Sequence, residues 1–223
     1  MLKLKINMPK ILILVFAVIS NSIYCMQQEY PLDMLYNGIK KNDIELVKKI
    51  IKSGVNVNER RCHKLLVLAC DKLRVEIVDL LLEANADVNS SDWVGRPCLS
   101  FAVFHRGLYN AGDKGERIID KLLRAGANPN KSDMQGTTPL MIYMKNPGDK
   151  FTLLCLLNAG ADLMIRGDEG NSLDIAKRQL TTESGKKWLK DFLDEYKRVI
   201  TKEIDKHLPN VLTSIVYDYV CME

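Results

Sequence analysis

The feature that most constrains the fold of this chain is a five-residue motif that occurs four times. A glycine or asparagine begins the motif, an amide or carboxylate residue stands third, and asparagine ends three of the four copies. The copies are residues 54–58, 85–89, 126–130 and 160–164, so their starts lie 31, 41 and 34 residues apart. Spacing in this range indicates a solenoid, in which each unit buries its apolar face against the next unit.

A stretch of apolar residues with helical spacing precedes each copy of the motif. The stretches contain Ile44, Val47, Ile50 and Ile51; Ile77, Val78, Leu81 and Leu82; Ile118, Ile119, Leu122 and Leu123; and Leu153, Leu154, Leu156 and Leu157. Residues with this spacing share one side of a helix. The motif glycine, or Asn85 in the second copy, is predicted to end that helix in the left-handed conformation.

A second helix start follows each of the last three copies. Gly95, Gly136 and Gly170 each stand six residues after the end of a copy. The clearest start is at Thr138 and Pro139. The Thr138 side chain can accept an unpaired backbone N–H as N-cap, and Pro139 then occupies the first turn, where no donor is needed.

These patterns resemble ankyrin repeats through most of residues 31–180. In the second repeat the match runs from Leu66 and Ala69 through residues 76–78 to residues 85–89. The resemblance implies pairs of antiparallel helices, each followed by a hairpin-like finger, that stack into a curved solenoid. We therefore expect an all-α, ankyrin-type solenoid of four helix-pair repeats and a partial fifth, with short hairpin fingers, capped by C-terminal helices.

The chain departs from the ankyrin pattern in three places. Met141 stands where a histidine normally follows Pro-Leu, and Tyr143 replaces a small residue. Residues 170–176 lack the proline and are one residue short, so the fifth unit is expected to be a cap. The spacing of 41 gives the third repeat about eight extra residues, which we place at 105–116. Their glycines predict a loop between the two helices of that repeat.

The first 25 residues have the order of a secretory signal peptide. Lys3, Lys5 and Lys10 precede the apolar run 11–19, and the small polar residues 20–22 follow it. Nine apolar residues fall short of the roughly 20 that a membrane-spanning helix needs. We expect residues 1–25 to direct export or secretion, with an uncleaved membrane anchor as the alternative.

The charge of the chain does not favour nucleic-acid binding. The formal net charge is +4, and it falls to +1 without the three lysines of the N-terminal segment. A nucleic-acid-binding domain is expected to carry a basic surface on its folded part. We therefore do not expect a nucleic acid as partner. We also expect no small-molecule substrate, and contact with a membrane only if the N-terminal segment is retained.

The six cysteines form no recognisable framework. They are Cys25, Cys62, Cys70, Cys98, Cys155 and Cys221, with no C-x-x-C pair and no histidine cluster. This spacing does not indicate a zinc site or a disulfide scaffold. We expect the cysteines to lie inside the stack, where they act as small apolar residues. This expectation conflicts with export to an oxidising compartment, and the sequence leaves the conflict open.

The C-terminal segment, 181–223, is expected to be a helical cap or tail. Residues 186–207 have the period of an amphipathic helix whose apolar face needs a surface, and the end of the solenoid is nearest. Residues 208–220, which begin Leu-Pro, resemble the start of F-box-like segments that recruit ubiquitin-ligase scaffolds. The alternative is a short capping helix.

No catalytic motif occurs in the sequence. His63, His105 and His207 lie in no H-E-x-x-H or nucleophile motif, and no glycine-rich phosphate loop is present. We expect the histidines on the surface or at caps, and we expect no enzyme, no cofactor and no metal. A catalyst of unrecognised type would need a buried cluster with shifted pKa values.

The resemblance implies that a partner protein binds the fingers and the first helices of the repeats. Carried onto this chain, the partner-binding residues are Arg60, Arg61, His63, Trp93, Val94, Arg96, Met134, Gln135, Arg166 and Glu169. Trp93 is the favoured hot spot, because tryptophan, arginine and methionine are enriched in interfaces. The alternative is a Trp93 folded over its neighbour. The predicted function is an exported, non-catalytic module that binds an unidentified protein, with a host-directed effector as one form of it.

Overall fold

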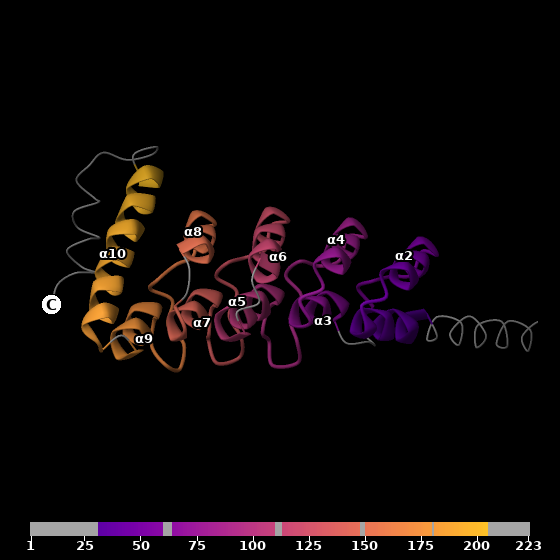
Figure 1. The fold of residues 1–223 in the computed structure, drawn as a ribbon, viewed down its shortest axis with the longest axis horizontal. Coiled ribbons are helices and arrows are strands. Elements are labelled where there is room, and N and C mark those ends of the chain that lie inside the picture. Colours follow the sequence, from indigo (N-terminus) through magenta and orange to yellow (C-terminus); the bar gives the residue numbers. More distant parts are fainter. Residues whose placement is uncertain (1–30, 60–63, 110–112, 148–149, 180, 205–223) are drawn as a thin grey trace, which may run out of the picture.

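Two rows of helices form the part of the chain that the computed structural model describes, which is residues 31–59, 64–109, 113–147, 150–179 and 181–204. The lower row in Figure 1 holds a helix at residues 31–41, α3 (Leu65–Asp71), α5 (Cys98–Tyr109), α7 (Pro139–Lys145) and α9 (Ser172–Gln179). The upper row holds α2 (Ile44–Lys52), α4 (Val75–Glu83), α6 (Asp113–Arg124) and α8 (Lys150–Asn158). Each lower helix and the upper helix after it make one repeat. α10 (Glu183–Ile204) stands across the end of the array (Figure 1).

The predicted apolar stretches face the interior between the two rows. Val47 and Ile50 of α2 and Ile77, Val78 and Leu81 of α4 are buried. The same positions of α6 and α8 are filled by Ile118, Ile119, Leu122, Leu153, Leu156 and Leu157, which are also buried. One core therefore runs through all the described repeats, and each repeat covers the apolar face of the next. The predicted all-α architecture of helix-pair repeats is confirmed.

The residues predicted to end and start helices do so. Gly54, Asn85, Gly126 and Gly160 follow the upper helices, with φ of 84°, 58°, 87° and 86°. Thr138 is the N-cap of α7 and accepts the backbone N–H of Met141 at 3.3 Å, with proline in the first turn. These local signals set the repeat length, because each helix stops where its motif begins.

The terminal asparagine of the motif links each repeat to the next. The side-chain amide of Asn130 donates to the Gly160 carbonyl at 2.8 Å and accepts the Asp162 backbone N–H at 2.7 Å. Equivalent pairs of hydrogen bonds join Asn58 to residues 85 and 87, and Asn89 to residues 126 and 128. The asparagine therefore satisfies backbone groups of the following repeat, which explains why it recurs.

The loop predicted for residues 105–116 is wrong for most of that range. α5 continues to Tyr109 and α6 already begins at Asp113, so the extra residues lengthen both helices of the third repeat. A glycine favours a loop only where no packing opposes it. Gly115 is buried, and a Cβ there would lie 2.8 Å from the Cβ of Arg106. The missing side chain lets the two helices approach closely, which keeps Gly115 in a helix.

α10 packs on the end of the array through aromatic side chains. Trp188 lies 6.2 Å from Tyr143 of α7, ring centre to ring centre, and stacks on Phe192 at 5.6 Å. Phe192 is buried and stacks in turn on Tyr196 at 6.3 Å. Tyr143, which replaces a small residue of the ankyrin pattern, therefore provides the platform for the amphipathic helix. The predicted signal peptide and residues 208–220 lie outside the described residues.

Candidate functional site

The fingers between repeats are hairpin turns, and an aspartate side chain holds two of the three in the described residues. We use finger 2 for residues 90–97, finger 3 for residues 131–138 and finger 4 for residues 165–170. In finger 2, the Asp92 carboxylate accepts the backbone N–H of Val94 at 3.0 Å and of Arg96 at 2.8 Å. Asp133 repeats this arrangement in finger 3. The carboxylate preorders each turn, because it satisfies backbone groups that no ladder pairs.

Neighbouring fingers are also bonded to one another. The Met134 backbone N–H donates to the Val94 carbonyl at 3.0 Å, and the Asp168 backbone N–H donates to the Gln135 carbonyl at 2.9 Å. Fingers 2, 3 and 4 therefore form one continuous rim along the lower edge of the array in Figure 1. The rim is rigid because each tip is fixed by its own turn and by the next finger.

The rim presents two large apolar side chains to solvent. Trp93 of finger 2 is 85% exposed and Met134 of finger 3 is 76% exposed. Trp93 does not fold over its neighbour, since such packing would cover most of the ring. An exposed tryptophan on a rigid turn loses little conformational entropy when a partner covers it, and it offers a large apolar area.

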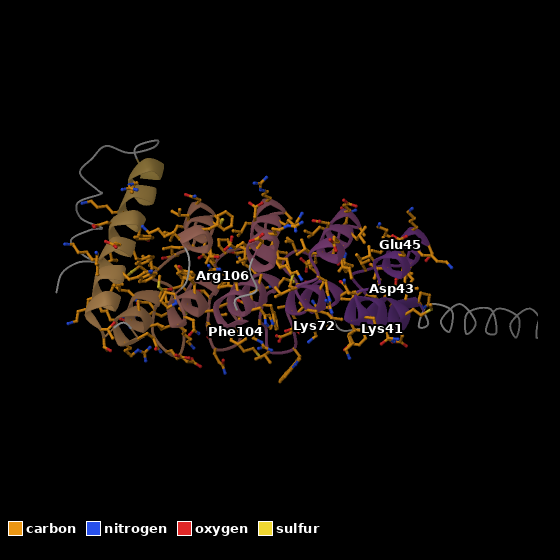
Figure 2. All side chains as sticks on the ribbon, viewed as in Figure 1. Lys41, Asp43, Glu45, Lys72, Phe104 and Arg106 are labelled. Atoms are coloured by element: carbon orange, nitrogen blue, oxygen red, sulfur yellow. The ribbon has the colours of Figure 1, made fainter. Side chains whose placement is uncertain are left out.

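Aromatic residues of α5 extend the rim onto the row of first helices. The Arg96 guanidinium carbon lies 4.7 Å from the Phe101 ring centre, and the guanidinium also pairs with Asp92 at 2.8 Å. Phe104, one turn further along α5, is 42% exposed, and Figure 2 shows it near Arg106. Residues three apart share a helix face, so Phe104 continues the surface that begins at the finger.

Sequence reasoning missed Phe101 and Phe104. Both stand in a run of apolar residues from 98 to 104, in which core and surface positions cannot be told apart by composition. The available signal was their spacing, because they lie on the opposite side of α5 from the buried Leu99, Ala102 and Val103.

His105 connects α5 to the preceding repeat. Its Nε2 atom lies 2.9 Å from a carboxylate oxygen of Asp71, and Lys72 pairs with the same carboxylate at 2.8 Å. Burial acts to raise the pKa of Asp71, but the hydrogen bonds from Lys72 and His105 outweigh it and lower this pKa. His105, expected at the surface or in a cap, is half-buried, because α5 extends past it and packs on α3.

The remaining predicted residues lie on fingers 2, 3 and 4 and in residues 60–63. Arg166 and Glu169 are exposed on finger 4. Glu169 pairs with Lys145 of α7, which lowers the pKa of the Glu169 carboxyl. Gln135 is exposed and Val94 half-buried on the rim. Arg60, Arg61 and His63 lie outside the described residues.

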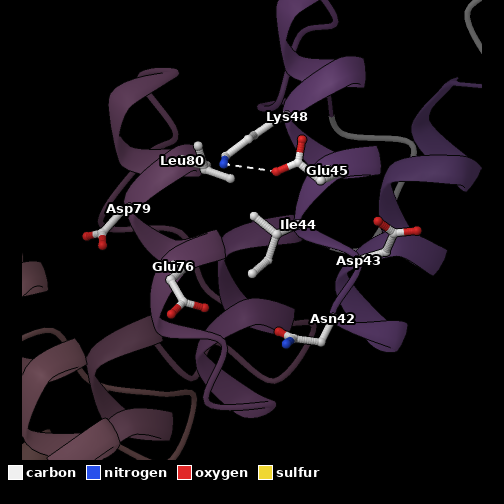
Figure 3. A pocket seen from close by; sticks show the side chains of 8 residues that line it. All are labelled: Asn42, Asp43, Ile44, Glu45, Lys48, Glu76, Asp79 and Leu80. Atoms are coloured by element: carbon white, nitrogen blue, oxygen red, sulfur yellow. Dashed lines mark hydrogen bonds and ion pairs between the residues drawn. The ribbon is translucent and has the colours of Figure 1, made fainter.

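A groove lies on the opposite side of the repeats, between α2 and α4 (Figure 3). Its volume is about 540 Å³, and the half-buried Ile44 and Leu80 lie among its lining residues. Carboxylates surround it, but three are engaged within the protein. The Asp43 side chain accepts the Leu46 backbone N–H at 3.0 Å as N-cap of α2. Glu45 pairs with Lys48 at 3.1 Å, and Asp79 pairs with Lys121 of α6 at 2.6 Å. The Asp79–Lys121 pair joins α4 to α6, the upper helices of neighbouring repeats, whereas Glu45 and Lys48 both belong to α2.

The described residues contain no group of three side chains suited to hold a metal ion. Among them, no helix has both the length and the apolar character needed to cross a bilayer. On the side shown in Figure 2, nitrogen and oxygen atoms of side chains are intermixed along the array. The rim presents apolar and aromatic area to a partner, and cationic and amide groups lie beside that area.

A comparison with known proteins agrees with this architecture. The chain is 32% identical over 124 residues to the ankyrin repeat protein YahD of Escherichia coli (strain K12). The fold is an ankyrin-type solenoid. The match covers 54% of this chain and 59% of YahD, so the chain spans about three fifths of the length of that relative. No protein-family model matches the chain.

The ankyrin-type fold is a helical repeat architecture. In such a solenoid the stacked repeats form an extended surface. The position of the rim on fingers 2 to 4 and α5 is therefore the feature on which a function can be built.

Proposed function

We propose that the chain is a non-catalytic protein-interaction module whose partner binds the rim of fingers 2 to 4 and the exposed face of α5. One observation carries the proposal. Trp93 and Met134 are exposed on adjacent fingers that are hydrogen-bonded through Met134 and Val94 at 3.0 Å. Two large apolar side chains exposed on neighbouring fingers stabilise a complex when a partner covers them.

The rim also defines what kind of surface would fit it. Phe101 and Phe104 add aromatic area, and Arg96 lies above Phe101 with its charge engaged by Asp92. A partner therefore needs an apolar ridge that reaches from the fingertips to α5. A substitution of Arg96 would disturb the finger as well as the contact with a partner. Trp93 and Met134 are therefore better positions for a test of binding alone.

The test compares capture of proteins by the full-length chain and by a Trp93→Ala, Met134→Ala double variant. The control is Phe151→Ala, Met34→Ala, which likewise removes one aromatic ring and one methionine side chain, at positions away from the rim that are 45% and 41% exposed. We expect the rim variant to weaken binding of a captured protein by about 30-fold or more, the effect of a lost hot spot, and the control to keep it. Circular dichroism confirms that both variants are folded.

Equal loss in both variants, or unchanged binding by the rim variant, would remove the rim from consideration. Capture is run in parallel from a bacterial and a eukaryotic lysate. A rim-dependent partner from the eukaryotic lysate alone supports the host-directed form of the function. Capture of no rim-dependent protein from either lysate counts against the proposed function.

We further propose that residues 1–25 direct export. The support is the order of three lysines, nine apolar residues and small polar residues, without an acidic residue. N-terminal sequencing of the chain recovered from culture medium and from cells tests this. A new N-terminus near residue 23 to 26 in the exported form is expected, and retention of the intact chain in the cells opposes it.

A further inference from the structure

Two buried cysteines lie in contact across the boundary between the second and third repeats. Cys70 is at the end of α3 and Cys98 begins α5, two helices that pack side by side in the lower row (Figure 1). Both residues are 0% exposed. Each thiol shifts the pKa of the other, so the two side chains are neighbours inside the core.

The surroundings make the two thiols unlike one another. The Ser90 hydroxyl lies 3.2 Å from the Cys98 sulfur, and the Cys98 thiol donates to the Ser90 carbonyl at 3.3 Å. The hydrogen bond with Cys70, helped by Ser90, lowers the pKa of Cys98, whereas burial raises the pKa of Cys70 well above its usual value. Cys98 therefore lies in a more polar setting than Cys70 in the folded array.

We propose that Cys70 and Cys98 are a disulfide site that joins the second and third repeats when the chain meets a small disulfide such as oxidised glutathione. The thiolate of one cysteine attacks one sulfur of the glutathione disulfide and releases one glutathione thiolate. That thiolate takes the proton of the other cysteine, whose sulfur then attacks the sulfur of the first cysteine and releases the second glutathione as a thiolate, which takes up the proton lost by the first cysteine. The two cysteines lose two electrons in total, and one glutathione disulfide becomes two glutathione thiols.

Burial decides when this bond forms and how long it lasts. Neither sulfur is reachable from water in the folded array, so the exchange takes place during folding or when the two repeats open. Once closed, the bond is protected from reductants by the same packing. The site therefore suits a chain that folds in an oxidising compartment, where these two buried cysteines would form a disulfide.

The experiment refolds the full-length chain from urea into glutathione buffers of graded ratio. Acid quenching, alkylation and peptide mass spectrometry then identify each linkage. We expect a Cys70–Cys98 peptide as the main product and a bond about 100-fold harder to reduce in buffer than in urea, because the fold holds the sulfurs together. The oxidised chain is expected to have a Tm roughly 5–10 °C higher than the reduced chain.

Two variants keep the proposal falsifiable. A Cys25→Ser, Cys62→Ser, Cys155→Ser, Cys221→Ser variant retains only the pair and should oxidise as the parent does. Cys98→Ala should lose both the linked peptide and the rise in Tm. The proposal is overturned if the pair stays reduced in oxidised glutathione, or if Cys70 and Cys98 link to other cysteines instead. Neither outcome bears on the proposal that a partner binds the rim, so the two proposals can fail separately.

Discussion

At the scale of single residues, Gly136 shows why finger 3 tolerates no side chain. Its φ is 74°, and a Cβ would lie 2.6 Å from the Cα of Gly167 in finger 4. The left-handed conformation alone costs an L-residue about 1 kcal/mol, and here the backbone of the next finger blocks the added atom. Gly126 has a similar φ of 87° with nothing within 4 Å of the Cβ position.

We expect Gly136→Ala to lower the free energy of unfolding by about 3 kcal/mol, and Gly126→Ala by about 1 kcal/mol. Urea unfolding followed by circular dichroism measures both. The difference between the two variants isolates the contact between fingers, because the conformational cost is shared. Equal losses would show that fingers 3 and 4 separate freely in solution.

At the scale of helices and loops, the sequence predicted where the helices end better than which side chains they expose. The helix ends follow from local chemistry, since Gly54, Asn85 and Thr138 act on their own neighbours in the chain. The extension of α5 and α6 could not be predicted, because it depends on Gly115 packing against Arg106. The exposure of Phe104 likewise depends on which side of α5 meets α3 and α7.

The pairing of Cys70 with Cys98 also lay beyond the sequence. The two residues are 28 positions apart with no spacing motif, and only the stacking of α3 on α5 brings their thiols together. Trp93 could be placed on a fingertip by the repeat register alone. Its exposure of 85% required knowing that finger 3 passes beside the ring without covering it.

The docking of α10 gives an element-scale prediction about pH. Burial raises the pKa of Tyr196 to about 12, with the negative charge of Asp162 adding to the shift and a hydrogen bond to the Leu163 backbone opposing it. The unfolded chain releases the tyrosine proton near pH 10, so between pH 10 and 12 the native state binds more protons. Native stability therefore falls as pH rises through this window, and this contribution is constant below it.

We expect Tyr196→Phe to make the loss of Tm between pH 10 and 12 shallower than in the parent chain. Thermal unfolding at a series of alkaline pH values measures the slope. The difference in phenolate absorbance between parent and variant should show a group that titrates near pH 12. A group that titrates at the ordinary tyrosine value would mean that Tyr196 is not packed on the end of the array.

For the whole molecule, stability is carried by contacts between neighbouring repeats. The core runs continuously from the helix at residues 31–41 to α10, and asparagine side chains tie each repeat only to the next. Such an array behaves as a chain of nearest-neighbour interactions. Damage at one end should therefore lower stability there first, while the opposite end keeps its structure.

Phe192→Ala tests this behaviour at the C-terminal end. Phe192 is 2% exposed and lies between Trp188 and Tyr196, so its removal is expected to cost about 3 kcal/mol. Hydrogen exchange should then quicken strongly in α8, α9 and α10 and change by less than about twofold in α3 and α4. The control Phe104→Ala removes an exposed ring and should leave exchange unchanged throughout. Uniform acceleration from α2 to α10 would mean that the array unfolds as one cooperative unit, and binding at the rim would then depend on the distant cap.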